Sequence, residues 1–328
     1  MRKRHRIAAR IVFAAAGLLM LAAAARAADY PKQTIRVVVP FAPAGVTDVV
    51  ARVVFEHIAR TSGATIVVEN RPGAGGTIAV EQVASAPPDG YTLVLNDPSG
   101  SLPASVTLYP DLKYKPLRDL APVAIFGNTG TVLLVGNDMP VKSAQELVAL
   151  AKAKPGQLTF ASTGVGTPGH LNGELFSRLA GIAAVHVPYR VVGQAVTDLI
   201  AGRISFWFAP IPTMLQQVRQ GLLRPLAVAG DGRSPDLPGI PTVQETGIGD
   251  FDASTTYAVF GPAGTPEAAV DWLSAAIARA LDDADVQQKL RAAGVQPKFG
   301  KPAEITAMLI ARIPQWAEVI KAAGIKVE

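Results

Sequence analysis

The chain has 328 residues, no cysteine, and a formal net charge of +5 from 31 basic and 26 acidic residues. Six of the basic residues and none of the acidic ones lie within residues 1–27, so the remaining chain has 25 basic against 26 acidic residues, a net charge of −1. That balance argues against a nucleic-acid binder, which needs a basic surface. Without cysteine, the chain can form no disulfide, thiol nucleophile or thiolate metal site.

The first 27 residues have the pattern of a secretory signal peptide. A basic segment, 1–10, precedes an apolar run over 11–25, and small residues stand at positions 25 and 27, where a signal peptidase reads them. The apolar run is shorter than the ~20 residues that a membrane-spanning helix needs. We therefore expect cleavage after Ala27 and a periplasmic protein. A retained N-terminal anchor is the alternative.

Downstream of residue 27, short β-branched runs alternate with amphipathic segments. Strands are predicted at 34–40, 64–69, 91–95, 131–135, 158–161, 185–187, 204–208, 225–229 and 255–260. Helices are predicted at 48–61, 77–84, 143–153, 171–180, 192–201, 267–293 with a break near Asp283, and 302–323. Continuous apolar strands separated by helices favour parallel sheets covered on both faces. The length and the two α/β sets predict two lobes.

The connection at 40–48 joins a predicted strand to a predicted helix that starts at Thr47 or Asp48. Ligands of open α/β sheets bind at the carboxyl ends of the strands. Free backbone N–H groups at a helix start form a site for an anion such as a carboxylate, and Thr47 adds a hydroxyl donor. Asp48 is expected to cap the helix. An ordinary strand–helix connection is the alternative.

A second connection, 162–170, has the same position after a strand and contains Gly164, Gly166 and Gly169. These glycines match G-x-G-x-x-G, but no acid follows about 20 residues on to hold a ribose, and Pro168 removes a backbone donor. We therefore expect no dinucleotide and no other cofactor. Open amides with hydroxyls and a histidine suit a carboxylate instead: Ser162, Thr163, Thr167 and His170.

Catalytic arrangements are scarce in this sequence. There is no G-x-S-x-G elbow, and His57, His170 and His186 lack a metal-ligand spacing, so no metal is expected. Ser162 with His170 is the one nucleophile–base pair that the sequence offers, without an evident third residue to orient the histidine. The sequence therefore predicts a binding protein, and a periplasmic serine hydrolase is a minor alternative.

Several ordered motifs carry a family resemblance. They are TIRVVVPFAPAGVTDVVAR (34–52), VENRPGAGG (68–76), PDGYTL (88–93), ASTGVGTPGHLNGELF (161–176), HVPYR (186–190), DLIAGRI (198–204), PTVQETG (241–247) and PAGTP (262–266). In this order they resemble the Bug-type receptors, the substrate-binding proteins of tripartite tricarboxylate transporters. The resemblance covers essentially the whole chain after the signal.

The resemblance implies a type II periplasmic-binding-protein fold with a ligand cleft between two α/β lobes. We expect one lobe from 28–128 with 256–328 and the other from 129–255. It also implies a carboxylate held by main-chain amides, hydroxyls and water. The family's ligand positions correspond here to Phe41, Ala44, Gly45, Val46, Asp48, Ser162, Thr163, Gly164, Thr167 and His170.

Three positions depart from the family's usual sequence. Ala44 stands where glycine is usual, and alanine tolerates positive φ poorly. Val191 follows Arg190 where the family has Lys-Gly, and Trp207 is larger than usual. If Trp207 reaches the cleft it can stack on an aromatic acid, whereas core packing is the alternative. Tyr189 is a further candidate for the cleft.

The expected function is capture of a dicarboxylate, acidic amino acid or aromatic acid, with delivery to membrane permease subunits. A ligand-sensing subunit of a membrane histidine kinase is the second hypothesis, because the same two lobes could dock on a kinase. We expect a monomer in either case.

Overall fold

The computed structural model describes residues 30–189, 191–230, 232–249, 251 and 254–327. The predicted signal peptide at 1–27 lies outside these residues. No helix in the described ranges is long and apolar enough to cross a bilayer.

The larger of two sheets has six strands in the order β11–β4–β10–β3–β1–β2. They are β1 (Ile35–Val39), β2 (Ile66–Asn70), β3 (Thr92–Asn96), β4 (Leu120–Thr129), β10 (Thr255–Pro262) and β11 (Gln296–Gly300). Strand β1 pairs in parallel with β2 and β3, whereas β10 runs antiparallel to β3 and β4. The predicted all-parallel sheet is therefore wrong, because β10 brings the chain back from the second sheet.

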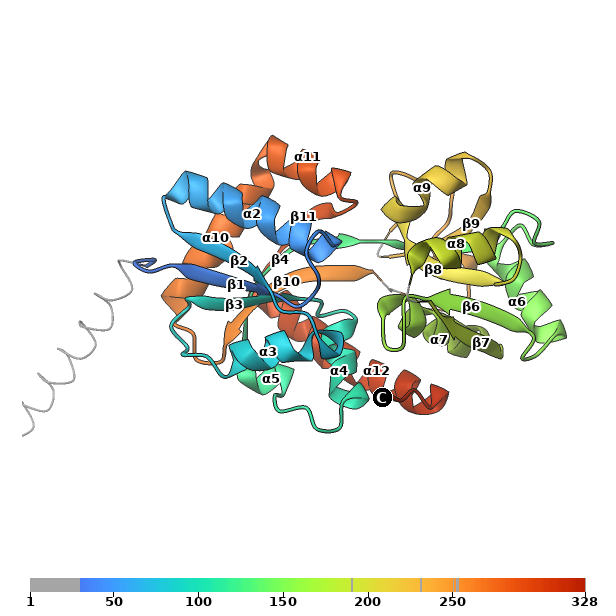
Figure 1. Cartoon of the computed structure of the whole chain (residues 1–328), viewed down its shortest axis with the longest axis horizontal. Helices are drawn as coiled ribbons and strands as arrows, with labels where there is room; N and C mark the ends of the chain where they lie inside the picture. The colour runs from blue at the N-terminus through green and yellow to red at the C-terminus, as the bar shows by residue number, and fades with distance from the viewer. Residues whose placement is uncertain (1–29, 190, 231, 250, 252–253, 328) are drawn as a thin grey trace, which may run out of the picture.

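Helices cover both faces of this sheet (Figure 1). One face packs on α2 (Val46–Ser62), α10 (Glu267–Asp282) and α11 (Ala284–Ala292). The other face packs on α3 (Thr77–Ala84), α4 (Ser101–Leu108) and the first half of α12 (Pro302–Ala323). The short elements α5 (Pro116–Asp119) and η1 (Ala74–Gly76) lie in connections.

The second sheet has five strands in the order β7–β6–β8–β5–β9. They are β5 (Thr131–Gly136), β6 (Leu158–Ser162), β7 (Ala184–Pro188), β8 (Phe206–Pro210) and β9 (Leu223–Ala229). Strand β6 is parallel to β7 and β8, and β5 is antiparallel to β8 and β9. The covering helices are α6 (Ala144–Ala153), α7 (Pro168–Ala180), α8 (Val192–Ile200) and α9 (Ile211–Arg219), and η2 (Gln244–Thr246) follows β9.

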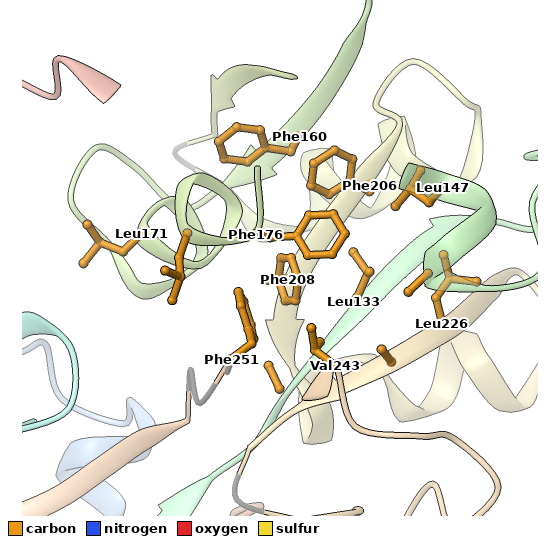
Figure 2. Close-up of a cluster of buried hydrophobic side chains, with 14 of the residues drawn as sticks. Leu133, Leu147, Phe160, Leu171, Phe176, Phe206, Phe208, Leu226, Val243 and Phe251 are labelled. Carbon is orange, nitrogen blue, oxygen red and sulfur yellow. The ribbon is translucent and has the colours of Figure 1, made fainter. Parts of the chain in front are cut away.

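An aromatic cluster fills the core between the second sheet and α7. Phe176 of α7 lies against Phe206 and Phe208 of β8, and Phe160 and Phe251 extend the cluster at its two ends (Figure 2). All five side chains are 1% exposed or less. This packing anchors β6, β8 and the start of α7, from which the candidate site is built.

The two sheets are joined by more than the strand connections. The chain crosses from β4 to β5 and returns from β9 to β10. In addition, Leu108 of α4 and Trp316, Val319 and Ile320 of α12 belong to the hydrophobic core of the second sheet. The Trp316 Nε1–H donates to the Ser99 carbonyl at 2.8 Å. The proposed lobe limits at residues 128/129 and 255/256 stay a prediction.

Candidate functional site

The amino end of α2 carries free backbone donors. The helix begins at Val46, and its N-cap, Gly45, provides no side-chain hydrogen bond. The first N–H groups of a helix have no acceptor within the helix, so those of Val46, Thr47 and Asp48 point out of it. Figure 1 shows this end of α2 directed toward the second sheet.

Asp48 is the third residue of α2, so the prediction that it caps the helix start is wrong. Its buried carboxylate accepts the Ala44 N–H at 2.9 Å, an Asn70 Nδ2–H at 2.9 Å and the Arg52 Nε–H at 3.1 Å. Burial by itself raises the pKa of Asp48, but these hydrogen bonds outweigh it and lower the pKa below its usual value. The Asp48 carboxylate is therefore ionised and holds the loop through its hydrogen bonds, and Arg52 balances its charge in an ion pair.

Asn70 ties the same loop to the neighbouring strand. Its Nδ2 also donates to the Phe41 carbonyl at 3.0 Å. Ala44 has φ of 64°, so the residue that replaces the usual glycine keeps the left-handed turn. Phe41 is exposed, with 36% of its surface accessible. The predicted residues of this loop are thus brought together as a braced turn at the end of β1.

The amino end of α7 is arranged in the same way after β6. Helix α7 begins at Pro168, three residues before the predicted start, because proline suits the first helical position. The N-cap Thr167 makes no side-chain cap; its hydroxyl donates to the Gly164 carbonyl at 2.7 Å. The N–H groups of Gly169 and His170 are left without acceptors inside the helix.

Two stacked histidines, His170 and His186, hydrogen-bond to the loop between β6 and α7. The Ser162 hydroxyl lies 2.6 Å from His186 Nε2, and the His186 ring stacks on His170 with centroids 3.6 Å apart. His170 Nδ1 accepts the Gly166 N–H at 3.0 Å, and its Nε2 lies 3.6 Å from Glu174. Burial, with the nearby His170, lowers the pKa of His186 to about 4, so its imidazole is neutral.

The predicted Ser162–His170 nucleophile–base pair does not form. Ser162 pairs with His186 instead, and its side chain is fully buried. In the described part of the chain no carboxylate forms an ion pair with His186. Nor do the described residues hold a group of three His, Asp or Glu that could bind a metal ion.

A cavity of about 150 Å³ opens beside the start of α7. Thr163 and Trp207 among the predicted residues line it, together with residues at strand ends and helix starts: Thr131, Pro168, Gly169, Val192, Phe208, Pro210, Thr213 and Thr255. Trp207 packs in the core against α8 and α9 with 2% of its surface exposed, as one of the two alternatives predicted, and its role toward a ligand stays a prediction. None of the described residues that line the cavity is charged.

Sequence reasoning missed Thr131, Thr213 and Thr255. Thr131 is the first residue of β5 and Thr255 the first residue of β10, and Thr213 lies in α9. The strand positions could have indicated the two threonines, because the chain crosses between the sheets there. Tyr189 lies elsewhere. Its hydroxyl donates to Asp198 at 2.7 Å, and it lines a separate open surface depression with Val191 and Arg203.

Comparison with known proteins places the chain in a family. Residues 50–325 match the model of the tripartite tricarboxylate transporter family receptor. The protein BugT of Bordetella pertussis is 36% identical over 318 residues, which cover 97% of each chain.

Two solved structures of similar proteins contain a ligand. One from Rhodopseudomonas palustris with adipate is 32% identical, with a TM-score of 0.75, and the match covers 91% of this chain and 99% of that one. MatC from the same organism, with bound malate, is 33% identical, with a TM-score of 0.73 over 89% of this chain and all of that one. These similarities confirm the predicted two-lobed type II fold, and the chain belongs to the tripartite tricarboxylate transporter receptor family.

Proposed function

We propose that this protein is a periplasmic solute receptor that captures a small carboxylate between its two lobes. The observation that carries the proposal is the pair of uncapped helix starts, α2 after β1 and α7 after β6, one on each sheet. Backbone donors and the helix dipole favour an anion at both places. The adipate- and malate-bound relatives support a carboxylate as that anion.

The proposed contacts are divided between the two loops. Val46 and Thr47 offer main-chain and hydroxyl donors on the first lobe, and Thr163, Gly169 and His170 offer main-chain donors on the second. Phe41, Ala44, Gly45, Gly164 and Thr167 shape the two turns. Asp48 and Ser162 act through the loops that they brace. The lobes, 28–128 with 256–328 and 129–255, close on the ligand.

The receptor delivers its ligand to the membrane permease subunits of a tripartite transporter. We propose a binding role and no catalytic one, because Ser162, the nucleophile that the sequence offered, is fully buried. The family membership supports the permease as partner. A receptor encoded beside a sensor kinase, without permease genes, would instead favour the sensory role.

A thermal-shift screen tests the proposal. We expect the protein purified from the periplasm to gain several degrees in Tm with at least one of adipate, malate, glutamate or benzoate, because ligands that bind the folded state stabilise it. The variant Thr47→Val, which removes the hydroxyl donor of the first loop, should lose part of that gain. A flat response to every carboxylate would reject the function.

A further inference from the structure

Trp207 differs from the other buried tryptophan in its hydrogen bonding. The Trp316 indole donates to a carbonyl, but the Trp207 Nε1–H has no acceptor within the described ranges. Buried indole N–H groups usually find a partner. Among the described residues, the one side-chain nitrogen or oxygen that is both inaccessible to solvent and without a hydrogen-bond partner is Gln217 Oε1, so the Trp207 nitrogen is not completely enclosed. The Trp207 nitrogen is therefore open to the cavity that its ring lines.

The free indole N–H lies at the amino end of α7. A Cβ built on Gly169 would lie 3.2 Å from Trp207 Nε1 and 3.2 Å from the Phe208 carbonyl. A side chain at position 169 would crowd the indole at this distance, so glycine favours the close approach of the indole to the first turn. The helix start therefore has the indole N–H as a second donor near its free N–H groups.

The rest of the cavity suits an uncharged body. Its lining includes the apolar side chains Trp207, Val192 and Phe208 together with four threonines, and none of the described lining residues is a cation. A second carboxylate buried there would lack a counter-charge and would be costly to desolvate. A volume of about 150 Å³ is the size of an apolar cavity that, in another protein, holds one benzene molecule.

We propose that the cavity beside α7 receives a monocarboxylate with a single ring as its apolar body, and that Trp207 is the specificity-determining residue. This assignment rests on the proposed function of carboxylate capture and narrows its substrate class. The Trp207 N–H and the first turn of α7 hold one carboxylate group, and the edge of the indole packs against the ring together with Val192 and Phe208. Aliphatic dicarboxylates are then the poorer ligands.

Calorimetric titration of the intact periplasmic protein with benzoate, benzamide, adipate and malate tests the assignment. We expect benzoate to bind at least about tenfold more tightly than adipate or malate, and benzamide to bind much more weakly, because it lacks the charge. A tighter affinity for either dicarboxylate overturns the assignment but leaves the receptor function standing. Absence of binding by all four probes overturns the assignment, whereas the receptor function is rejected only if the wider thermal-shift screen is also flat.

Two variants of Trp207 separate its roles. Trp207→Phe keeps an aromatic wall but lacks the N–H, and should weaken benzoate binding about tenfold. Trp207→Leu should also abolish the preference for benzoate over adipate. Trp272→Phe, on α10 of the first lobe, is the matched control and should bind as the wild type does. Both Trp207 variants are first shown to be folded by their melting transitions. Unchanged benzoate affinity in Trp207→Phe overturns the assignment.

Discussion

At the scale of single residues, Ala44 is the clearest point of strain in the site. Its φ of 64° lies in the left-handed region, which costs an L-residue about 1–2 kcal/mol. Replacing Ala44 by glycine would remove this cost, but glycine loses more conformational entropy on folding, which offsets part of the gain. The N–H donated to Asp48 holds the turn in place despite the strain.

We expect Ala44→Gly to raise the free energy of unfolding by about 0.5–1 kcal/mol, because glycine adopts this conformation without a steric cost. Urea denaturation followed by circular dichroism measures the change. Ala42→Gly, at an exposed neighbour without a positive φ, is the control and should give no gain. A loss of stability in Ala44→Gly would contradict the strain argument.

His186 makes the stability of the second lobe depend on pH. Its pKa of about 4 lies below the ordinary 6.5, so the fold favours the neutral ring. Above about pH 6.5 the ring is neutral in both the folded and the unfolded protein, and the free energy of unfolding is highest. As the pH falls from 6.5 toward 4, the unfolded protein takes up the proton first, so the free energy of unfolding decreases. His186→Gln keeps a donor for Ser162 but cannot titrate, so its Tm should fall less than that of the wild type between pH 6.5 and 4.5. Parallel Tm curves for the two proteins would refute this role.

Residue types indicated where the site lies, but not which of its atoms are free. The strand-then-glycine pattern predicted two strand–helix connections, and the structure has both, between β1 and α2 and between β6 and α7. It could not show that Ser162 turns away to His186, because the partner lies 24 residues further along the chain. Nor could it show the cavity beside Trp207, because this side chain belongs to a hydrophobic core cluster and also lines the cavity.

At the scale of elements, periodicity predicted the long helices well. The bounds of α3 and α12 match the predicted ranges, and the break before α11 falls at Asp283, whose carboxylate caps that helix. Helix α4 was not predicted, because its sequence, SLPASVTL, contains a proline and does not separate an apolar face from a polar one at helical spacing. Strands β4 and β11 were missed for want of alternation, since β4 is buried along most of its length.

Helix α12 contributes to both lobes, and Trp316 is its main anchor in the second. Trp316→Ala should cost about 3–5 kcal/mol of unfolding free energy, through the cavity it leaves and the lost bond to the Ser99 carbonyl. Arg178→Ala removes the exposed ion pair from α7 to Glu318 of the same helix and should cost less than about 0.5 kcal/mol. Chemical denaturation of the two variants side by side checks the ranking, and similar losses would contradict it.

At the scale of the whole molecule, apolar side chains stand exposed on the loops that we expect to meet. Phe41 is 36% exposed, and Val165 on the second lobe is 42% exposed. Closure over a ligand would bury both, which adds a hydrophobic contribution to the ligand's own contacts.

The absence of native cysteine makes closure measurable by cross-linking. We expect a short bis-maleimide to link Ala42→Cys to Val165→Cys faster at a saturating concentration of a carboxylate that binds. A matched pair, Val67→Cys with Val185→Cys, lies on the outer strands β2 and β7, where both positions are exposed, and should not react faster with ligand. An unchanged rate in the first pair would show that the lobes do not approach each other there.

The lining of the cavity beside α7 also bears on how the affinity of the receptor depends on ionic strength. A site that held its ligand by ionic attraction would lose affinity as dissolved salt screened that attraction. In the site that we propose, amide and indole dipoles hold the carboxylate, and no described lining side chain is ionic. We therefore expect its affinity to fall less with ionic strength than that of a site built from lysine or arginine, although salt still screens the helix dipole.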